Sequence, residues 1–240
     1  MKIAVQLYSV RDHIENGEDL LAILPKVKEL GYDGVEFAGY FELPAETLRK
    51  ALDDAGLVAV GTHMDIKNYK PRKLMETIEY CKTLGMTTIG MGGAPHDTPA
   101  KLRDTCEILK KAAPVAEENG MKIYYHNHSD EFEQNKNGVY PFDALKDACC
   151  LEIDTYWSHH AGQDNYKLIT ENKDRIVHLH VKDGIDGKPL ALGEGDCDIA
   201  KVVKAAKDIG IEWLIVENDD PVPTGLEDIG RSIKYLKTLV

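Results

Sequence analysis

A unit of three parts recurs along this chain and limits its fold more than any other feature. Each copy has an amphipathic helix, a glycine that can end the helix in the left-handed conformation, and a short β-branched or apolar run. Gly31, Gly56 and Gly120 mark three of these transitions. With the other apolar runs, the pattern predicts eight short strands, at residues 3–7, 34–37, 57–60, 87–89, 122–125, 150–154, 176–181 and 213–216.

A helical segment follows each predicted strand. Strict alternation predicts a parallel sheet, because a helix is the usual crossover that returns the chain to the same sheet edge. Eight such units favour closure into a (β/α)₈ TIM barrel over an open sheet. The 240 residues suit one such barrel and no Pro-, Ser- or Gly-rich linker divides them, so we expect a single domain over residues 1–240. Pro114 should kink or divide the helical segment 99–118.

Charge and cysteine usage narrow the classes of partner and compartment. The formal net charge of -12 opposes binding to nucleic acid or to an anionic membrane, since both are held by a basic face. The five cysteines are odd in number and lack Cys-x-x-Cys spacing, which favours reduced thiols over disulfides or a cysteine zinc site. No signal-like or membrane-length apolar run occurs. We therefore predict a cytoplasmic protein that binds a small molecule; assembly into a homo-oligomer stays open.

Titratable side chains gather where the predicted strands end. In a parallel barrel, the C-terminal strand ends and the loops after them form the active face. A lone histidine there is more often a hydrogen-bonded structural residue than a ligand, so it is the number of such groups at one rim that indicates a site. In chain order, the candidates are Glu36, His63, His126, His128, Glu131, Glu152, Asp154, His178, His180, Lys182, Glu217 and Asp219.

Strand adjacency and parity select among these residues. Asp154, His180 and Glu217 end three neighbouring strands, where one shared cation would neutralise two carboxylates beside an imidazole. His178, His180 and Lys182 alternate along one strand and must face the same side. His178 lies deeper and could simply fill the core, whereas Lys182 could reach a substrate oxygen from the rim.

Further side chains are predicted to face a ligand. His126 and His128 share one side of their strand if it stays regular, so both could approach a ligand together. Trp157 could stack on the face of a sugar, although packing at the rim explains it equally well. Glu36 and His63 complete the predicted substrate contacts.

The order of these motifs resembles the xylose isomerase-like TIM barrel superfamily, the group of sugar phosphate isomerases and epimerases. That group includes ketose 3-epimerases, hydroxypyruvate isomerase and inosose dehydratase, with endonuclease IV as a distant relative. The resemblance covers nearly the whole chain. It rests on Gln6-Leu7-Tyr8-Ser9-Val10-Arg11-Asp12, Gly34-Val35-Glu36, Tyr125-His126-Asn127-His128, Asp154 with Trp157, His180-Val181-Lys182-Asp183, Leu192-Gly193-Glu194-Gly195 and Val216-Glu217-Asn218-Asp219.

The resemblance implies a divalent metal ion, of the kind Mn, Co, Mg or Zn. In the family, Glu from strand 5, Asp from strand 6, His from strand 7 and Glu from strand 8 hold the ion, and Asp154, His180 and Glu217 match the last three. The strand 5 glutamate is missing, because that strand ends in the His126 motif. The fourth ligand is then Glu131 from the following loop, a histidine of that motif, or water.

The resemblance also implies proton transfer beside a carbonyl through an enediolate. Glu217 can keep one of the family's two proton-transfer roles, and the opposing base would be His126, His128 or Glu131, with Lys182 as a further catalytic candidate. The first hypothesis is a metal-dependent isomerase or epimerase of a small sugar, sugar phosphate or keto-sugar. The alternative on the same fold is a sugar dehydratase or lyase, similar to inosose dehydratase or acting on a keto-glycoside.

Two other classes are less favoured. A DNA-repair enzyme similar to endonuclease IV would need a trinuclear zinc cluster and a DNA-binding surface, whereas this chain is acidic. A sugar-binding barrel without catalysis is suggested by the missing strand 5 glutamate. Incision of an abasic duplex by metal-loaded protein would support the DNA-repair class, and a retained ligand without turnover of a panel of sugars would support the binding barrel.

Overall fold

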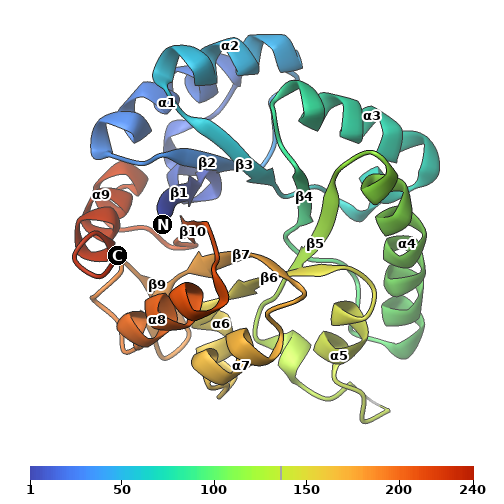
Figure 1. Cartoon of the computed structure of the whole chain (residues 1–240). Helices are drawn as coiled ribbons and strands as arrows, with labels where there is room; N and C mark the ends of the chain where they lie inside the picture. The colour runs from blue at the N-terminus through green and yellow to red at the C-terminus, as the bar shows by residue number, and fades with distance from the viewer. Residues whose placement is uncertain (136) are drawn as a thin grey trace.

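A computed structural model describes residues 1–135 and 137–240, and its centre is a parallel sheet rolled into a barrel (Figure 1). Within the described residues, eight strands are ordered β3-β2-β1-β10-β7-β6-β5-β4. Between the two end strands, His63 and Gly90 form an isolated parallel bridge, and Met64 N donates to Gly90 O at 2.9 Å. The strands are β1 (Lys2–Gln6), β2 (Gly34–Phe37), β3 (Val58–Thr62), β4 (Thr88–Met91), β5 (Lys122–His126), β6 (Cys150–Asp154), β7 (Ile176–Val181) and β10 (Trp213–Val216).

Helices surround the barrel in chain order (Figure 1). They are α1 (Gly17–Leu30), α2 (Ala45–Ala55), α3 (Pro71–Thr83), α4 (Pro99–Glu118), α5 (Pro141–Lys146), α6 (Thr155–His160), α7 (Asn165–Glu171), α8 (Ile199–Ile209) and α9 (Gly225–Leu236). Short 3₁₀ segments follow three strands: η1 (Leu7–His13), η2 (Ile66–Tyr69) and η3 (Asp130–Phe132). The antiparallel hairpin β8 (Asp183–Ile185) and β9 (Lys188–Leu190) is inserted after β7. No helix of the described residues is long and apolar enough to cross a membrane.

The structure confirms the predicted TIM barrel. Predicted strands 34–37, 150–154, 176–181 and 213–216 coincide with β2, β6, β7 and β10, and the others differ by one or two residues at an end. Gly31 and Gly210 end α1 and α8 in the left-handed conformation, with φ of 98° and 75°. The expected division at Pro114 is wrong, because α4 continues through it. One lost backbone hydrogen bond does not break a helix whose buried face, including Leu109 and Ala112, is packed on the barrel.

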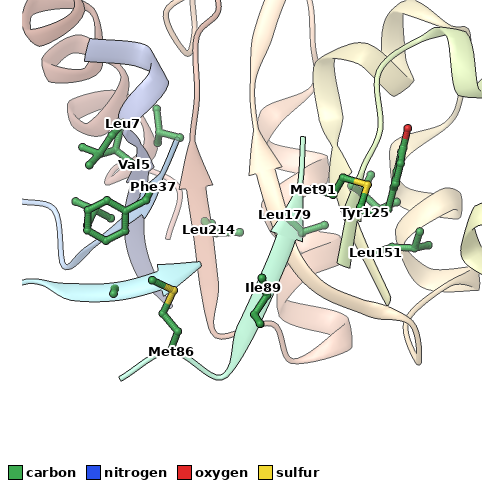
Figure 2. Close-up of a cluster of buried hydrophobic side chains, with 14 of the residues drawn as sticks. Val5, Leu7, Phe37, Met86, Ile89, Met91, Tyr125, Leu151, Leu179 and Leu214 are labelled. Carbon is green, nitrogen blue, oxygen red and sulfur yellow. The ribbon is translucent and has the colours of Figure 1, made fainter. Parts of the chain in front are cut away.

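Side chains on the two faces of the strands pack in different environments. Outward-facing side chains such as Val5, Ile89 and Leu179 pack beneath the helices in the main apolar core (Figure 2). Inside the barrel, the apolar cluster is small and consists of Ala4, Val60 and Ile215, with Trp213 against it. Above that cluster the interior is polar. Fully buried side chains there include Gln6, Glu36, Glu152, Asp154, His180 and Lys182, each 0% exposed. A layer of buried charge is therefore carried at the C-terminal end of the barrel.

Gly90 on β4 leaves space that this polar layer needs. A methyl group at Gly90 would overlap the ring of Tyr124, whose hydroxyl donates to Glu36. We expect Gly90→Ala to lower the free energy of unfolding by about 1–3 kcal/mol, the usual cost of overpacking. Urea denaturation would measure it. In the matched control Gly230→Ala, in α9, the new methyl would meet Leu30 at an ordinary 3.4 Å, and a small gain in stability is expected. Equal effects of the two substitutions would contradict the overpacking argument.

Candidate active site

A hollow of about 380 Å³ opens at the C-terminal ends of the strands, which is the active face of barrels of this kind. Its volume lies within the range of small-ligand sites, roughly 300–1,000 Å³. The wall combines imidazoles, carboxylates and small residues, contributed by Tyr8, Ala38, His63, Gly92, His126, His128, Glu217 and Asp219.

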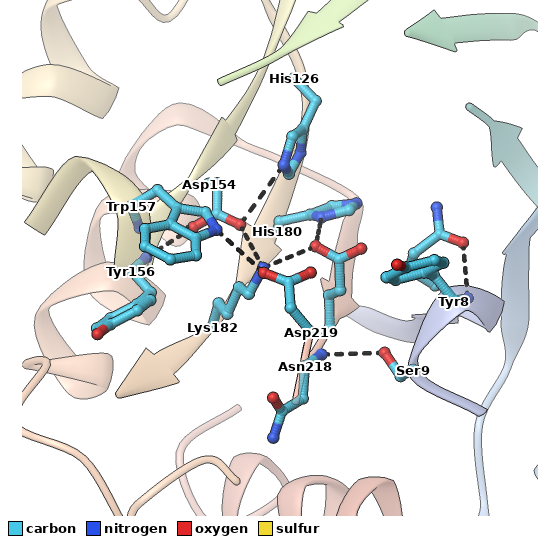
Figure 3. A network of polar contacts seen from close by, with 12 residues as sticks. Tyr8, Ser9, His126, Asp154, Tyr156, Trp157, His180, Lys182, Asn218 and Asp219 are labelled. Atoms are coloured by element: carbon cyan, nitrogen blue, oxygen red, sulfur yellow. Dashed lines mark hydrogen bonds and ion pairs between the residues drawn. The ribbon is translucent and has the colours of Figure 1, made fainter. Parts of the chain in front are cut away.

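Four titratable side chains converge at one side of this hollow. His126, Asp154, His180 and Glu217 each offer a ligand atom, and these four atoms lie within 4.8 Å of one another. They come from the ends of β5 and β6, from β7, and from the residue after β10. The structure thus brings together the three predicted ligands Asp154, His180 and Glu217, and it adds His126 (Figure 3).

The two oxygens of Asp154 have different surroundings. Its Oδ1 caps α6 by accepting hydrogen bonds from Tyr156 N at 2.9 Å and Trp157 N at 2.8 Å. Its Oδ2 is buried without a hydrogen-bond partner among the described residues, and Lys182 Nζ lies 3.5 Å from it. Burial, followed by the charge of Glu217, raises the pKa of Asp154 to about 6. A buried carboxylate oxygen without a hydrogen bond is available to a cation.

A buried glutamate lies behind each imidazole of this cluster. His180 has Nε2 2.6 Å from Glu36 Oε2 and Nδ1 3.0 Å from Glu217 Oε2. His126 has Nδ1 3.2 Å from Glu152 Oε2 and Nε2 3.7 Å from Asp154 Oδ2. A carboxylate that binds one ring nitrogen fixes the orientation of the ring and leaves the other nitrogen for a metal ion. The four residues therefore fit a divalent cation, with nitrogen and oxygen ligands suited to Mn, Co or Zn.

Lys182 places an ammonium group against the same carboxylates. Its side chain is fully buried, and Nζ lies 3.1 Å from Glu217 Oε2 and 3.5 Å from Asp154 Oδ2, with Asp219 Oδ2 also bound. Burial opposes the charge of this ammonium, yet Glu217, Asp154 and Asp219 together raise the pKa of Lys182. The lysine stays protonated, and its charge lowers the pKa of Glu217.

Trp157 supports this arrangement from the side (Figure 3). Its Nε1 donates to Asp219 Oδ2 at 3.1 Å, and Lys182 Nζ lies 5.4 Å from the centre of its ring. The predicted sugar-stacking role of Trp157 stays a prediction, because the contacts of its indole are with Asp219 and Lys182.

Two glutamates beneath the hollow hold the imidazoles in place. Glu36, predicted as a substrate contact, lies in this lower layer and accepts hydrogen bonds from Gln6 Nε2 at 2.9 Å and from Tyr124 OH. Glu152 is equally buried; burial alone would raise its pKa, yet His180 and His63 hold it well below its ordinary value. Glu36 therefore faces the imidazoles of His180 and His63 and is not part of the wall of the hollow.

His63 and His128 reach the hollow from the β3 and β5 side. His63 Nε2 lies 2.7 Å from Glu152 Oε2, and its side chain is 14% exposed. Burial opposes protonation of His63, but Glu36 and Glu152 raise its pKa. The ring of His128 contacts that of His126 edge to face, with centroids 5.0 Å apart. The structure thus brings both histidines of the strand 5 motif to the mouth, although β5 ends at His126.

Glu131, the predicted fourth metal ligand, lies away from this cluster. Its Oε1 accepts from Tyr125 OH at 2.8 Å and its Oε2 from His128 N at 2.7 Å. It groups instead with His96 and Asp130. The chain turns into η3 directly after the strand, and this carries Glu131 to the outward, Tyr125 side. His126, and not Glu131, is the fourth residue of the group that could hold a metal ion with Asp154, His180 and Glu217.

Comparison with known proteins agrees with the barrel fold. A model of the family described as Xylose isomerase-like TIM barrel matches residues 24–239. An inosose dehydratase of Clostridium perfringens is 22% identical over 253 aligned residues, covering 86% of this chain and 85% of that protein. A sugar phosphate isomerase/epimerase from Parabacteroides distasonis superimposes with a TM-score of 0.82 at 24% identity, covering 98% and 97% of the two chains. An L-ribulose 3-epimerase gives a TM-score of 0.76 at 16% identity, covering 99% and 94%.

Proposed function

The chain belongs to the xylose isomerase-like TIM barrel family, and from this premise we propose that it removes the proton beside the carbonyl of a keto-sugar and expels the oxygen substituent on the next carbon. The reaction would be that of a dehydratase when the leaving group is hydroxide and of a lyase when it is an alkoxide. Family membership itself supports an enzyme that modifies sugars.

Two imidazoles that line the hollow carry this proposal. His63 and His128 reach it from the β3 and β5 side, whereas Glu217 and Asp219 line it from the loop after β10. Elimination needs one base for the carbon-bound proton and one acid for the departing oxygen, and an imidazole can take either role. The curated relative described above is an inosose dehydratase, which also supports loss of an oxygen substituent.

The roles of the chain's own groups follow from their places in the hollow and their contacts. His63 has a raised pKa and lines the hollow, which suits a proton donor to the leaving oxygen. His128 lines the same hollow, and among the described residues no carboxylate forms a hydrogen bond with its ring, which suits the base that accepts the carbon-bound proton. The carbon-hydrogen and carbon-oxygen bonds break, a carbon-carbon double bond forms, and water or an alcohol leaves.

A divalent cation completes the proposed site. Asp154 Oδ2, Glu217, His180 Nδ1 and His126 Nε2 would hold it. When bound, it would act as a Lewis acid that stabilises negative charge on the carbonyl oxygen of the substrate. Lys182 shares Glu217 and Asp154 with that position and balances part of their charge.

The loop after β7 favours a substrate without a phosphate group. Backbone N–H groups of Gly193, Gly195 and Cys197 do converge on an anion, but that anion is the carboxylate of Asp183, at 2.9 to 3.1 Å. Arg11, at the edge of the mouth, donates to the main-chain oxygens of Tyr8 and Asp219. These donors are therefore already used within the chain.

Product analysis tests the proposal directly. Protein loaded separately with Mn, Co, Mg or Zn would be incubated in D₂O with inososes, ketoses and 3-keto-glucosides, and the products followed by NMR. Loss of water or alcohol supports elimination.

Deuterium incorporation with inversion of configuration and no loss of water or alcohol supports the second candidate, an epimerase. That candidate is favoured by one observation: Glu217 and His128 follow strands separated by β6 and β7, so they approach a ligand from different sides.

His126 and His128, the two histidines of the strand 5 motif, should have different functions. We expect His126→Gln to lower the affinity for Mn²⁺ by about tenfold to a hundredfold or more, because it removes a ligand. We expect His128→Gln to keep that affinity but lower kcat by about a hundredfold, the usual scale for losing a general base. Calorimetric titration with Mn²⁺ and steady-state kinetics measure the two effects. Full turnover and an unchanged pH profile in both variants would make this segment structural.

A further inference from the structure

A second hollow, of about 180 Å³, lies beside the first at the mouth of the barrel. It is formed where η1, the start of α1 and the loop after β2 meet. Apart from the Arg11 side chain and the backbone of Gly39, its wall is apolar or aromatic, with Leu7, Tyr8, Ile14, Leu20, Ala38 and Phe41.

The two hollows share part of their walls. Tyr8 and Ala38 line both of them. The Arg11 guanidinium stacks on the Tyr8 ring at 4.1 Å and donates to Asp219 O at 2.6 Å, so the shared aromatic wall is tied to the loop that carries Asp219. A ligand held at the carboxylates and imidazoles would enter an apolar space if a substituent extended past Tyr8.

Phe41 forms the outer edge of this space at a conformational cost. Its side chain is 44% exposed, although phenylalanine is usually buried. Its φ is 49° and that of Glu42 is 58°, a left-handed conformation that bulky residues seldom adopt. Such strain persists where the surrounding structure imposes it, and it concentrates at ligand sites.

We propose that this second hollow binds an apolar, ring-sized substituent attached to the sugar. Its volume is slightly larger than the roughly 150 Å³ of an engineered protein cavity that holds benzene. The inference rests on the proposed function and refines it: the substituent is the leaving group, joined to the sugar through the oxygen that departs. The proton leaves the carbon beside the carbonyl, the bond from the next carbon to that oxygen breaks, and the oxygen takes up a proton, so that an alcohol and an unsaturated keto-sugar are formed.

The test compares two substrates that differ only in the size of the apolar group. Methyl and benzyl 3-keto-glucosides, in both anomeric forms, both release primary alcohols, so the chemistry of the leaving group is matched. We expect kcat/KM for the benzyl compound to exceed that for the methyl compound by about tenfold to a hundredfold, the range given by burial of a ring of phenylalanine size. Binding of both compounds is measured separately by calorimetry.

Two variants locate the effect. Phe41→Ala should reduce the preference for benzyl by roughly threefold or more, because Phe41 lines the second hollow and not the first. Tyr140→Ala is the matched control; Tyr140 is 43% exposed and lines neither hollow. It should leave the preference unchanged.

The outcomes separate the subsite from the reaction. Turnover of both compounds at equal rates, or a preference that Phe41→Ala does not reduce, overturns the subsite while the proposed reaction stands. Tighter binding of the benzyl compound that is lost in Phe41→Ala, without any turnover, supports the subsite and overturns the elimination. Equal binding of both compounds without turnover overturns both.

Discussion

Replacement of Glu217 by glutamine should lower kcat/KM by about a thousandfold, the largest catalytic loss we expect from one substitution. Glu217 Oε2 lies 3.0 Å from His180 Nδ1 and 3.1 Å from Lys182 Nζ. Burial alone would raise the pKa of Glu217, but Lys182 and His180 hold it well below its ordinary value. Glutamine keeps the shape and removes the charge, so both the proposed cation site and the charge balance of Lys182 are lost.

The Glu217→Gln experiment needs a folded protein and a nearby control. Circular dichroism checks the fold, and kinetics use the keto-sugar identified in the NMR panel. Asp220→Asn changes an exposed carboxylate three residues further along and should leave kcat/KM within about twofold. Activity of Glu217→Gln within tenfold of the native protein would show that Glu217 has only a structural part.

The barrel was predictable because each of its signals is local. A glycine that ends a helix, as Gly31 does, and the β-branched run after it lie within a few residues of each other. Parity along a strand is equally local, so the common facing of His178, His180 and Lys182 followed from the sequence alone. The convergence of Asp154, His180 and Glu217 followed from the barrel topology once the strands were placed.

The sequence left the fourth ligand open between Glu131, a histidine of the strand 5 motif and water, because the choice depends on where one strand stops. β5 ends at His126 and the chain turns into η3, which sends Glu131 toward Tyr125. Loop geometry of this kind is not encoded in a periodic pattern. Glu152 was among the candidates at the strand ends, and parity explains its place: it lies two residues before Asp154 on β6 and therefore faces the same interior.

The burial of Lys182 could not be predicted from the sequence for a different reason, because its partners come from distant parts of the chain. Asp154 precedes it by a full βα unit, and Glu217 and Asp219 follow the last strand of the barrel. A lysine on a strand that ends at the rim suggested an extended side chain reaching a substrate. In the folded chain, three carboxylates surround its ammonium instead.

Removal of that ammonium should cause the largest loss of stability. We expect Lys182→Met to lower the free energy of unfolding of chelator-treated protein by about 3–5 kcal/mol, because buried carboxylates are left without their cation. A divalent ion binds only the folded site and would supply the missing positive charge, so saturating Mn²⁺ should restore much of the loss. Urea denaturation with chelator and with Mn²⁺ measures both effects.

Lys204→Met is the control, since Lys204 is 63% exposed and its pair with Asp208 contributes at most about 1 kcal/mol. Equal destabilisation in the two variants would contradict a charge-balancing role for Lys182. A loss in Lys182→Met that Mn²⁺ does not reverse would argue against a cation at Asp154 and Glu217, whatever the substrate proves to be.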